Sequence, residues 1–241
     1  MNQIELWMQT PIPTARAAYP GYDPDAPLPP APEAGEPVLD ITDCHPRIAY
    51  AASYLHMGVP GALTRCYVRK GVYERLCRAL DLLPEAYSLR IYDSLRPQRV
   101  QQALYDDYFA RVKAEHPDLS EEQAACLTEE FVARPVLDRL HPSSHQSGGA
   151  VDLTLCLEGR ELDMGTGFDE FAPIAHADAF EREGLDETVR RNRRLLHHAM
   201  RQAGFTHYSA EWWHFDYGDG PWARRTHSAP LYAFCAEGDL R

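Results

Sequence analysis

The sequence lacks several features that would place it in a special class of protein. Its six cysteines are scattered and include no C-x-x-C pair, so we expect free thiols and no zinc site built from cysteines. Basic residues are also in deficit, because 24 Lys and Arg against 36 Asp and Glu give a formal net charge of −12. Without a surplus of positive charge to release counterions from phosphates, a nucleic-acid partner is not expected.

Long apolar segments are missing as well. No window approaches the length of a membrane span, and residues 1–8 have no basic start, apolar run or small-residue cleavage site. We therefore expect a cytoplasmic protein with no membrane partner. What is present is ordinary for a globular chain: 241 residues, 44% hydrophobic and 25% charged, enough for one sizeable core.

Proline is concentrated near the amino terminus. The segment 10–37 is crowded with prolines, most densely in PLPPAP at 27–32. Proline fixes φ and cannot donate a backbone hydrogen bond, so we expect an extended arm with polyproline II character. The chain thus divides into a proline-rich arm, residues 1–37, and a compact domain, residues 38–241. The arm is expected to wrap over the domain; a docking site for a proline-binding partner is the alternative.

The compact domain mixes separated helices with short strands. Apolar residues at helical spacing predict helices over 72–83, 97–112 and 188–203, with a shorter one opening at 120. Alternation and aromatic content predict strands over 87–93, 149–155, 205–208 and 212–217. This order favours an α+β fold, with a small, mainly antiparallel sheet flanked by helices.

The stretch SSHQSGGAVD, residues 143–152, carries the first candidate site residues. Asp152 interrupts an apolar strand, and the strand period places it on the face opposite Val151. A buried carboxylate is costly unless it is paired or bound to a metal. His145 precedes it, and the glycine pair 148–149 can bend the backbone so that imidazole and carboxylate converge.

A second stretch, EWWH at residues 211–214, adds an imidazole and another carboxylate. In a regular strand Glu211 and His214 would point to opposite faces. For both to meet one ion, either Glu211 lies on a turn or bulge leading into the strand, or the segment makes a helical turn. The surrounding aromatic residues would wall the site and lower its dielectric constant, while also packing in the core.

Arg96 is the remaining candidate. It stands in YDSLRP, residues 92–97, after a predicted strand and before a proline that suits a helix start. A guanidinium there could stabilise a developing oxyanion. A divalent ion with three protein ligands and an open position lowers the pKa of a bound water to about 7. Together these residues predict a metal-dependent hydrolase.

These segments together resemble the D-alanyl-D-alanine dipeptidases of the VanX type. Those enzymes belong to a group of zinc peptidases with D-Ala-D-Ala carboxypeptidases, certain phage endolysins and the Hedgehog signalling domain. The similarity runs from about residue 47 to residue 217 and includes YDSLRP, SxHxxGxAxD, DLTL, MGxxFD, NRR, AGF and EWWH. It implies a Hedgehog-like peptidase fold and hydrolysis of a small dipeptide, D-Ala-D-Ala, which keeps that dipeptide out of peptidoglycan precursors.

The resemblance also implies a role for each candidate in the metal site. His145, Asp152 and His214 would hold one zinc ion per chain. Glu211 would act as general base and acid, and Arg96 would stabilise the tetrahedral intermediate.

Substrate contacts follow from the same resemblance. Ser143 and Asp169 match positions near the amino end of the substrate. Apart from the resemblance, Trp213 is expected to contact the substrate as one of the aromatic residues that wall the site. The family usually carries an Asn-Phe-Thr-Gly-like element after its first Tyr-Ala. Here the stretch 50–58 reads YAASYLHMG, so the exact dipeptide specificity stays open.

Three other functions compete with this one. A D,D- or L,D-carboxypeptidase or endopeptidase acting on larger peptidoglycan fragments would use the same zinc, although no export signal is seen. A non-haem iron oxygenase could use His176 and Asp178 with a later histidine, in a polar stretch. A non-catalytic metal-binding module would not need Glu211. The remaining histidines, among them His197 and His207, are expected at surfaces or helix ends.

Overall fold

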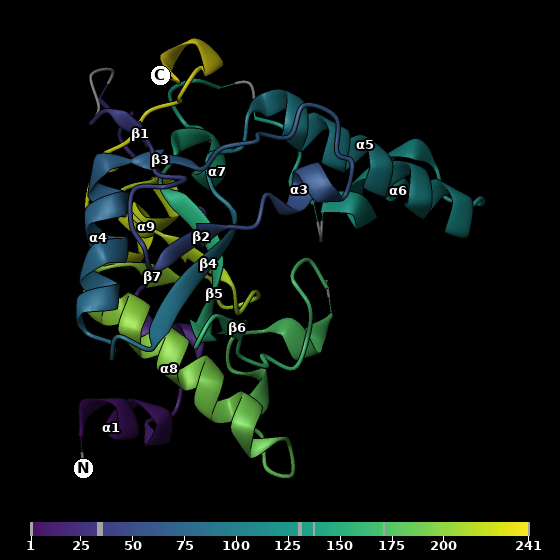
Figure 1. Ribbon diagram of the computed structural model, residues 1–241. Coiled ribbons are helices and arrows are strands. Elements are labelled where there is room, and N and C mark those ends of the chain that lie inside the picture. Colours follow the sequence, from purple (N-terminus) through teal and green to yellow (C-terminus); the bar gives the residue numbers. More distant parts are fainter. Residues whose placement is uncertain (1, 33–35, 130–131, 137, 171, 241) are drawn as a thin grey trace.

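A six-stranded sheet forms the centre of the computed structural model, which describes residues 2–32, 36–129, 132–136, 138–170 and 172–240 (Figure 1). The strand order is β2-β4-β5-β8-β7, with β6 paired to β5. Only β2 and β4 are parallel, and the other neighbours are antiparallel. The strands are β2 (Ile48–Tyr50), β4 (Tyr87–Asp93), β5 (Ala150–Leu157), β6 (Arg160–Glu161), β7 (Thr206–His207) and β8 (His214–Asp216). The predicted α+β fold with a small, mainly antiparallel sheet is confirmed.

Two helices cover one face of this sheet, α4 (Lys70–Asp81) and α8 (Glu187–Ala203) (Figure 1). Leu76 of α4 and Leu195 of α8 share one apolar core with alternate residues of β5, among them Leu153. Asp186 caps the amino end of α8, and Gly204 ends it in the left-handed region at φ 110°. Because β5 turns Leu153 into this core, Asp152 is left on the opposite face, as the alternation predicts.

The remaining elements are short or stand apart from the sheet. Helices α5 (Gln98–Glu115) and α6 (Glu121–Glu129) pack on each other and project from the body (Figure 1). A second, two-stranded antiparallel sheet joins β1 (Val38–Asp40) to β3 (Tyr67–Arg69). Short helices are α3 (Ser53–His56), α7 (Ser144–Ser147) and α9 (Gly220–Thr226), with 3₁₀ turns at Pro173–Ala175, Ala179–Glu181 and Glu237–Asp239. Among the described residues, every helix is too short or too polar to traverse a bilayer.

The N-terminal arm differs from the extended segment that its prolines predict. It contains two helices, α1 (Gln3–Gln9) and α2 (Ala15–Ala18), and α1 packs on α8. The expectation of a continuous extended segment from residue 10 is wrong for α2, because its three alanines and one arginine all have high helix propensity. The division into an arm, 1–37, and a domain, 38–241, stays a prediction.

Candidate metal centre

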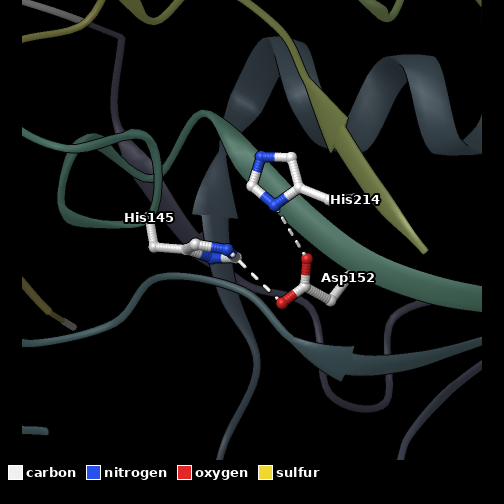
Figure 2. A group of neighbouring side chains, drawn as sticks. All are labelled: His145, Asp152 and His214. Atoms are coloured by element: carbon white, nitrogen blue, oxygen red, sulfur yellow. Dashed lines mark hydrogen bonds and ion pairs between the residues drawn. The ribbon is translucent and has the colours of Figure 1, made fainter. Parts of the chain in front are cut away.

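Three buried side chains converge on one point: His145, Asp152 and His214 (Figure 2). Their ligand atoms all lie within 4.8 Å of one another. Asp152 Oδ2 is 3.4 Å from His145 Nε2, and Asp152 Oδ1 is 3.0 Å from His214 Nδ1. The three residues that the sequence singles out as metal ligands are therefore neighbours.

Strand register brings two of the three together. Asp152 of β5 and His214 of β8 are direct partners in an antiparallel pair, so their side chains leave the sheet side by side. The two strands approach closely at Gly149, where an added Cβ would lie 2.7 Å from the carbonyl oxygen of Tyr217. Because glycine has no Cβ, the hydrogen-bonded pairing of β5 with β8 can begin at Gly149, one residue before Ala150.

Helix α7 supplies the third side chain. This single turn opens with a capping box between Ser143 and Gln146 and ends at Gly148, which adopts φ 74°. Such a left-handed residue favours glycine because it has no Cβ to clash. The turn carries His145 back over the start of β5, above Asp152 (Figure 2).

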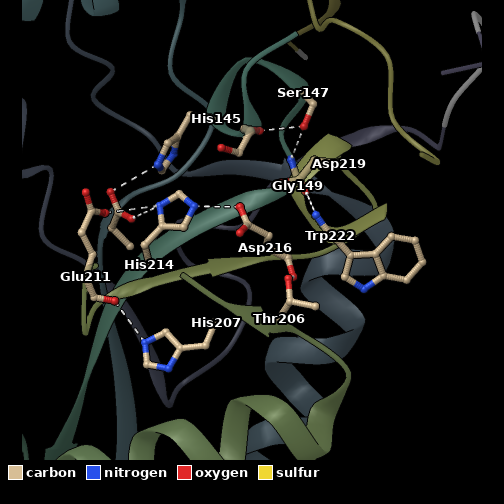
Figure 3. Close-up of polar contacts among 12 residues, drawn as sticks. His145, Ser147, Gly149, Thr206, His207, Glu211, His214, Asp216, Asp219 and Trp222 are labelled. Atoms are coloured by element: carbon tan, nitrogen blue, oxygen red, sulfur yellow. Dashed lines mark hydrogen bonds and ion pairs between the residues drawn. The ribbon is translucent and has the colours of Figure 1, made fainter. Parts of the chain in front are cut away.

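The outer nitrogen of each histidine already has an acceptor. His145 Nδ1 donates to the carbonyl of Ser94 at 2.7 Å. His214 Nε2 donates to Asp216 Oδ1 at 2.7 Å (Figure 3). In the neutral imidazoles this leaves one lone pair each, on the nitrogen that faces Asp152. Histidines that bind metals have this second contact almost without exception. Two imidazoles and a carboxylate oriented in this way fit a divalent cation such as zinc.

Charge in the site follows from these contacts. Burial alone would raise the pKa of Asp152, but His145 and His214 outweigh it and hold that pKa well below its usual range. Burial would likewise lower the pKa of His214, yet Asp216 and Asp152 raise it well above the ordinary value. Asp216 is held by Arg225, which forms a close ion pair with its second oxygen. Acidic and basic groups thus alternate from Asp152 through His214 and Asp216 to Arg225.

Glu211 lies beside the three ligands, on the turn between β7 and β8 rather than in a strand or helix. The sequence leaves open either a turn leading into the strand or a helical turn, and the structure has the turn leading into the strand. Glu211 Oε2 is 3.8 Å from His214 Nδ1, and its side chain is 22% exposed where that of Asp152 is 2% exposed. Burial raises the pKa of the Glu211 carboxyl. A partly accessible carboxyl with a raised pKa is suited to general acid–base chemistry.

Arg96 reaches the site from the segment after β4. Its Nη2 lies 3.5 Å from Asp152 Oδ2, while Nε donates to Asp93 at 2.8 Å and Nη1 to Gln101 at 2.8 Å. These contacts fix the plane of the guanidinium. Burial lowers the pKa of this guanidinium, but Tyr54 and the nearby carboxylates more than offset it, so Arg96 stays a cation in the site.

Tyr54 is a site neighbour that the sequence analysis missed. Its hydroxyl accepts a hydrogen bond from Arg96 Nη2 at 3.1 Å, and the guanidinium lies 4.9 Å from the centre of its ring. Helix α3 carries it, after Ala52 in the left-handed region at φ 47°. The stretch 50–58 departs from the family element, so nothing in the sequence marks this tyrosine.

The three predicted substrate contacts lie in different environments. Ser143 caps α7, with its hydroxyl 3.1 Å from Gln146 Oε1. Asp169 lies near Arg96 and Tyr54, and burial raises the pKa of its carboxyl to about 7. Trp213 is 1% exposed and packs edge-on against neighbouring rings, so it has little surface to offer a ligand. Their substrate roles stay predictions.

His176 and Asp178, the ligands considered for an iron oxygenase, belong to no group of three possible metal ligands in the described part of the chain. A buried three-ligand set with a carboxyl and an arginine alongside is instead the arrangement of a metallohydrolase.

Comparison with known proteins narrows this class. Residues 48–231 match the peptidase M15 family, described as D-Ala-D-Ala dipeptidase. The D-alanyl-D-alanine dipeptidase of Synechocystis sp. is 30% identical over 215 residues, covering 80% of this chain and 87% of the relative. That of Escherichia coli is 33% identical over 154 residues, covering 63% of this chain and 67% of the relative. The chain belongs to the D-Ala-D-Ala dipeptidase family and is a peptidase, which excludes the oxygenase.

A solved structure is also similar, that of a vancomycin resistance D,D-pentapeptidase VanY in complex with Zn(II). It has a TM-score of 0.44 and 18% identity, and the similarity covers 83% of this chain and 90% of that one.

Proposed function

We propose that this protein is a zinc-dependent dipeptidase that hydrolyses D-Ala-D-Ala or a closely related small dipeptide. The observation that carries the proposal is the convergence of His145, Asp152 and His214, with Glu211 beside them, in a chain whose relatives are named D-alanyl-D-alanine dipeptidases. We further propose that it acts on the free dipeptide in the cytoplasm, before that dipeptide enters peptidoglycan precursors.

His145, Asp152 and His214 would hold the zinc ion, since two imidazoles and a carboxylate are a ligand set that zinc accepts. A zinc ion bound there would supply a water of pKa about 7 and would polarise the carbonyl of the substrate. The chain's own side chains supply the rest of the chemistry.

Glu211 is the group that moves the proton. Its carboxylate takes a proton from the attacking water and then passes it to the amine that leaves. The pKa of this carboxyl is raised by burial, which brings it toward the working pH and favours both halves of the transfer. General acid–base catalysis of this kind is worth about 10²–10⁴ in rate.

Arg96 stabilises the negative charge that develops on the carbonyl oxygen. Asp93 and Gln101 hold its Nε and Nη1, so the guanidinium need not reorganise when the charge appears. A preorganised donor at such an oxyanion contributes about 10²–10³ in rate.

Asp169 and Ser143 would bind the ammonium group of the dipeptide. The Asp169 carboxyl is buried, which raises its pKa to about 7, so an ammonium ion beside it would favour its charged form. Such a contact selects substrates with a free amino end near the scissile bond. It therefore favours a dipeptide over a longer peptidoglycan stem.

Metal content and substrate preference together test the proposal. Purified protein would be assayed for zinc by mass spectrometry and for alanine release from D-Ala-D-Ala, its L-isomers and a pentapeptide ending in D-Ala-D-Ala. We expect one zinc per chain and alanine from D-Ala-D-Ala, with little from the pentapeptide. A preference for the pentapeptide would identify a carboxypeptidase instead. If zinc-loaded protein hydrolyses none of these substrates, the alternative of a non-catalytic metal-binding module would be favoured.

A further inference from the structure

The N-terminal arm contacts the back of the site, and Tyr19 makes the contact nearest to Glu211. This residue follows α2, is 6% exposed and packs its ring against the guanidinium groups of Arg201 and Arg225. Its hydroxyl accepts from the backbone N–H of His207 at 2.6 Å and lies 3.2 Å from the carbonyl oxygen of the same residue. Strand β7, which holds His207, ends the sheet. Tyr19 thus occupies the backbone groups that this edge would otherwise leave open.

His207 in turn holds the turn on which Glu211 lies (Figure 3). Its Nε2 is 3.1 Å from the carbonyl oxygen of Glu211 and 3.2 Å from that of Trp212. Both partners are acceptors, so Nε2 carries the proton. Its Nδ1 then accepts from His197 Nδ1 at 2.8 Å. The imidazole also stacks on Phe215 with ring centres 4.3 Å apart, so its orientation is set from three sides.

The Glu211 carboxylate depends on this backbone for its position. The closest ion-pair partner recorded for it is His214, at 3.8 Å. Its own N–H makes only a long bond of 3.4 Å to the carbonyl of Tyr208. A displacement of about 1 Å in a catalytic group can cost on the order of 10²-fold in rate. The groups that hold this turn therefore determine the position of the Glu211 carboxylate.

A second contact from the arm reaches a metal ligand by another route. Arg225, which pairs with Asp216 behind His214, is surrounded by the rings of Tyr19 and Tyr22 at 5.7 Å each and of Tyr208 at 5.6 Å. Two of these three rings belong to the arm. The same segment therefore packs on both groups that support the site from behind.

We infer that Tyr19 and His207 are positioning residues for Glu211, and that the N-terminal arm is thereby part of the catalytic unit. The expected change in kcat rests on the proposed function. The expected ordering of the turn that carries Glu211 rests only on the contacts above. The arm would do more than wrap over the domain, because it supports the turn of Glu211 from behind.

Single substitutions in the full-length, zinc-loaded chain test this inference. Tyr19→Phe removes the hydroxyl and keeps the ring, and we expect kcat to fall about tenfold with KM and zinc affinity unchanged. His207→Leu should lower kcat about 10²-fold, because both carbonyls of the turn lose their donor. His207→Gln, which can still donate, should restore most of that loss.

A matched control is Tyr232→Phe. Tyr232 is also buried, and its hydroxyl hydrogen-bonds to Glu36, near the carboxyl end of the arm, at 3.0 Å. This substitution deletes one buried hydroxyl without touching His207, so kcat should stay at the wild-type value. Equal losses of kcat in Tyr19→Phe and Tyr232→Phe would mean that both substitutions act by lowering the stability of the fold. That result would contradict the inference.

Amide hydrogen exchange supplies a measurement that needs no activity. Tyr19→Phe should increase exchange in a peptide spanning 208–213 and Tyr232→Phe should not. If the wild-type protein releases no alanine, the proposed function fails, but this exchange comparison still decides whether the arm orders the turn. Unchanged exchange and unchanged kcat in both Tyr19→Phe and His207→Leu would overturn the inference.

Discussion

Two pairs of buried histidines lie in this molecule with nearly the same distance between their rings. The rings of His145 and His214 are 5.0 Å apart, and those of His197 and His207 are 5.1 Å apart. All four side chains are at least nine-tenths buried. The pairs differ in what surrounds them.

Carboxylates surround the first pair and are missing from the second among the described contacts. Asp152 and Asp216 flank His214 and raise its pKa, whereas burial lowers the pKa of His207 to about 3. His197, buried and next to His207, has its pKa lowered well below the usual value. Burial alone therefore yields neutral histidines that hold backbone together, and adjacent carboxylates turn a similar pair into a cation site.

Removal of one histidine from each pair gives the largest contrast. His214→Ala should abolish zinc binding and hydrolysis, because it deletes a ligand. His197→Gln should keep one zinc per chain. Zinc content after gel filtration, measured on both variants, checks this. A zinc-free His197→Gln protein would show that the two pairs are not functionally distinct.

Glu211 sharpens the comparison, because the proposed function assigns proton transfer to this neighbour of the first pair. Glu211→Ala and Glu211→Gln should lower kcat by about 10²–10⁴-fold while the zinc content stays at the wild-type level. Alanine release and metal analysis on the same sample check both halves. Substantial turnover by the zinc-loaded variant would remove Glu211 from the mechanism.

Asp216 tests whether the carboxylate behind His214 matters to the ion. Asp216→Asn keeps the shape and one acceptor oxygen but loses the charge that pairs with Arg225. We expect the zinc dissociation constant, measured by competition with a chelator, to rise about 10–100-fold. A value within twofold of wild type would mean that charge behind the ligand is unimportant here.

The second pair, His197 and His207, should instead affect how the stability of the protein changes with pH. Its histidines are neutral in the folded state, with pKa values below the usual 6.5. Unfolding at lower pH therefore takes up protons, so stability is complete above about pH 6.5 and declines as the pH falls below it. Each such histidine contributes about 1.4 kcal/mol per pH unit.

Urea denaturation of the metal-free protein at pH values from about 7 to about 5 measures this decline. His197→Gln removes one of the two titrating groups, so its stability should fall less steeply than that of the wild type. Parallel curves for the two proteins would contradict the assignment.

The sequence predicts that His145, Asp152 and His214 converge because each residue obeys a local rule. Asp152 is an acid in an apolar strand, and the two-residue period fixes its face. His145 and His214 then follow from glycines that bend the chain and from a neighbouring strand. The long helices are predicted for the same reason, since apolar spacing within about four residues determines them.

Features that depend on distant contacts could not be predicted in this way. His197 and His207 were expected at surfaces or helix ends, and this is wrong, because α8 packs on β7 and encloses both. Tyr54 reaches Arg96 across 42 residues of chain. The conformation of the Glu211 turn could not be chosen either, since it depends on His207 and Tyr19.

Asp152 and His214 lie inside the hydrogen-bonded ladder of β5 and β8, while Glu211 lies outside it, on residues 209–213. An insertion or deletion in this loop would move the carboxylate and leave the strand register intact. A descendant of this enzyme could therefore lose turnover and still retain its ion through changes confined to this loop. For an engineer, the same separation makes ion capture and bond cleavage independently adjustable.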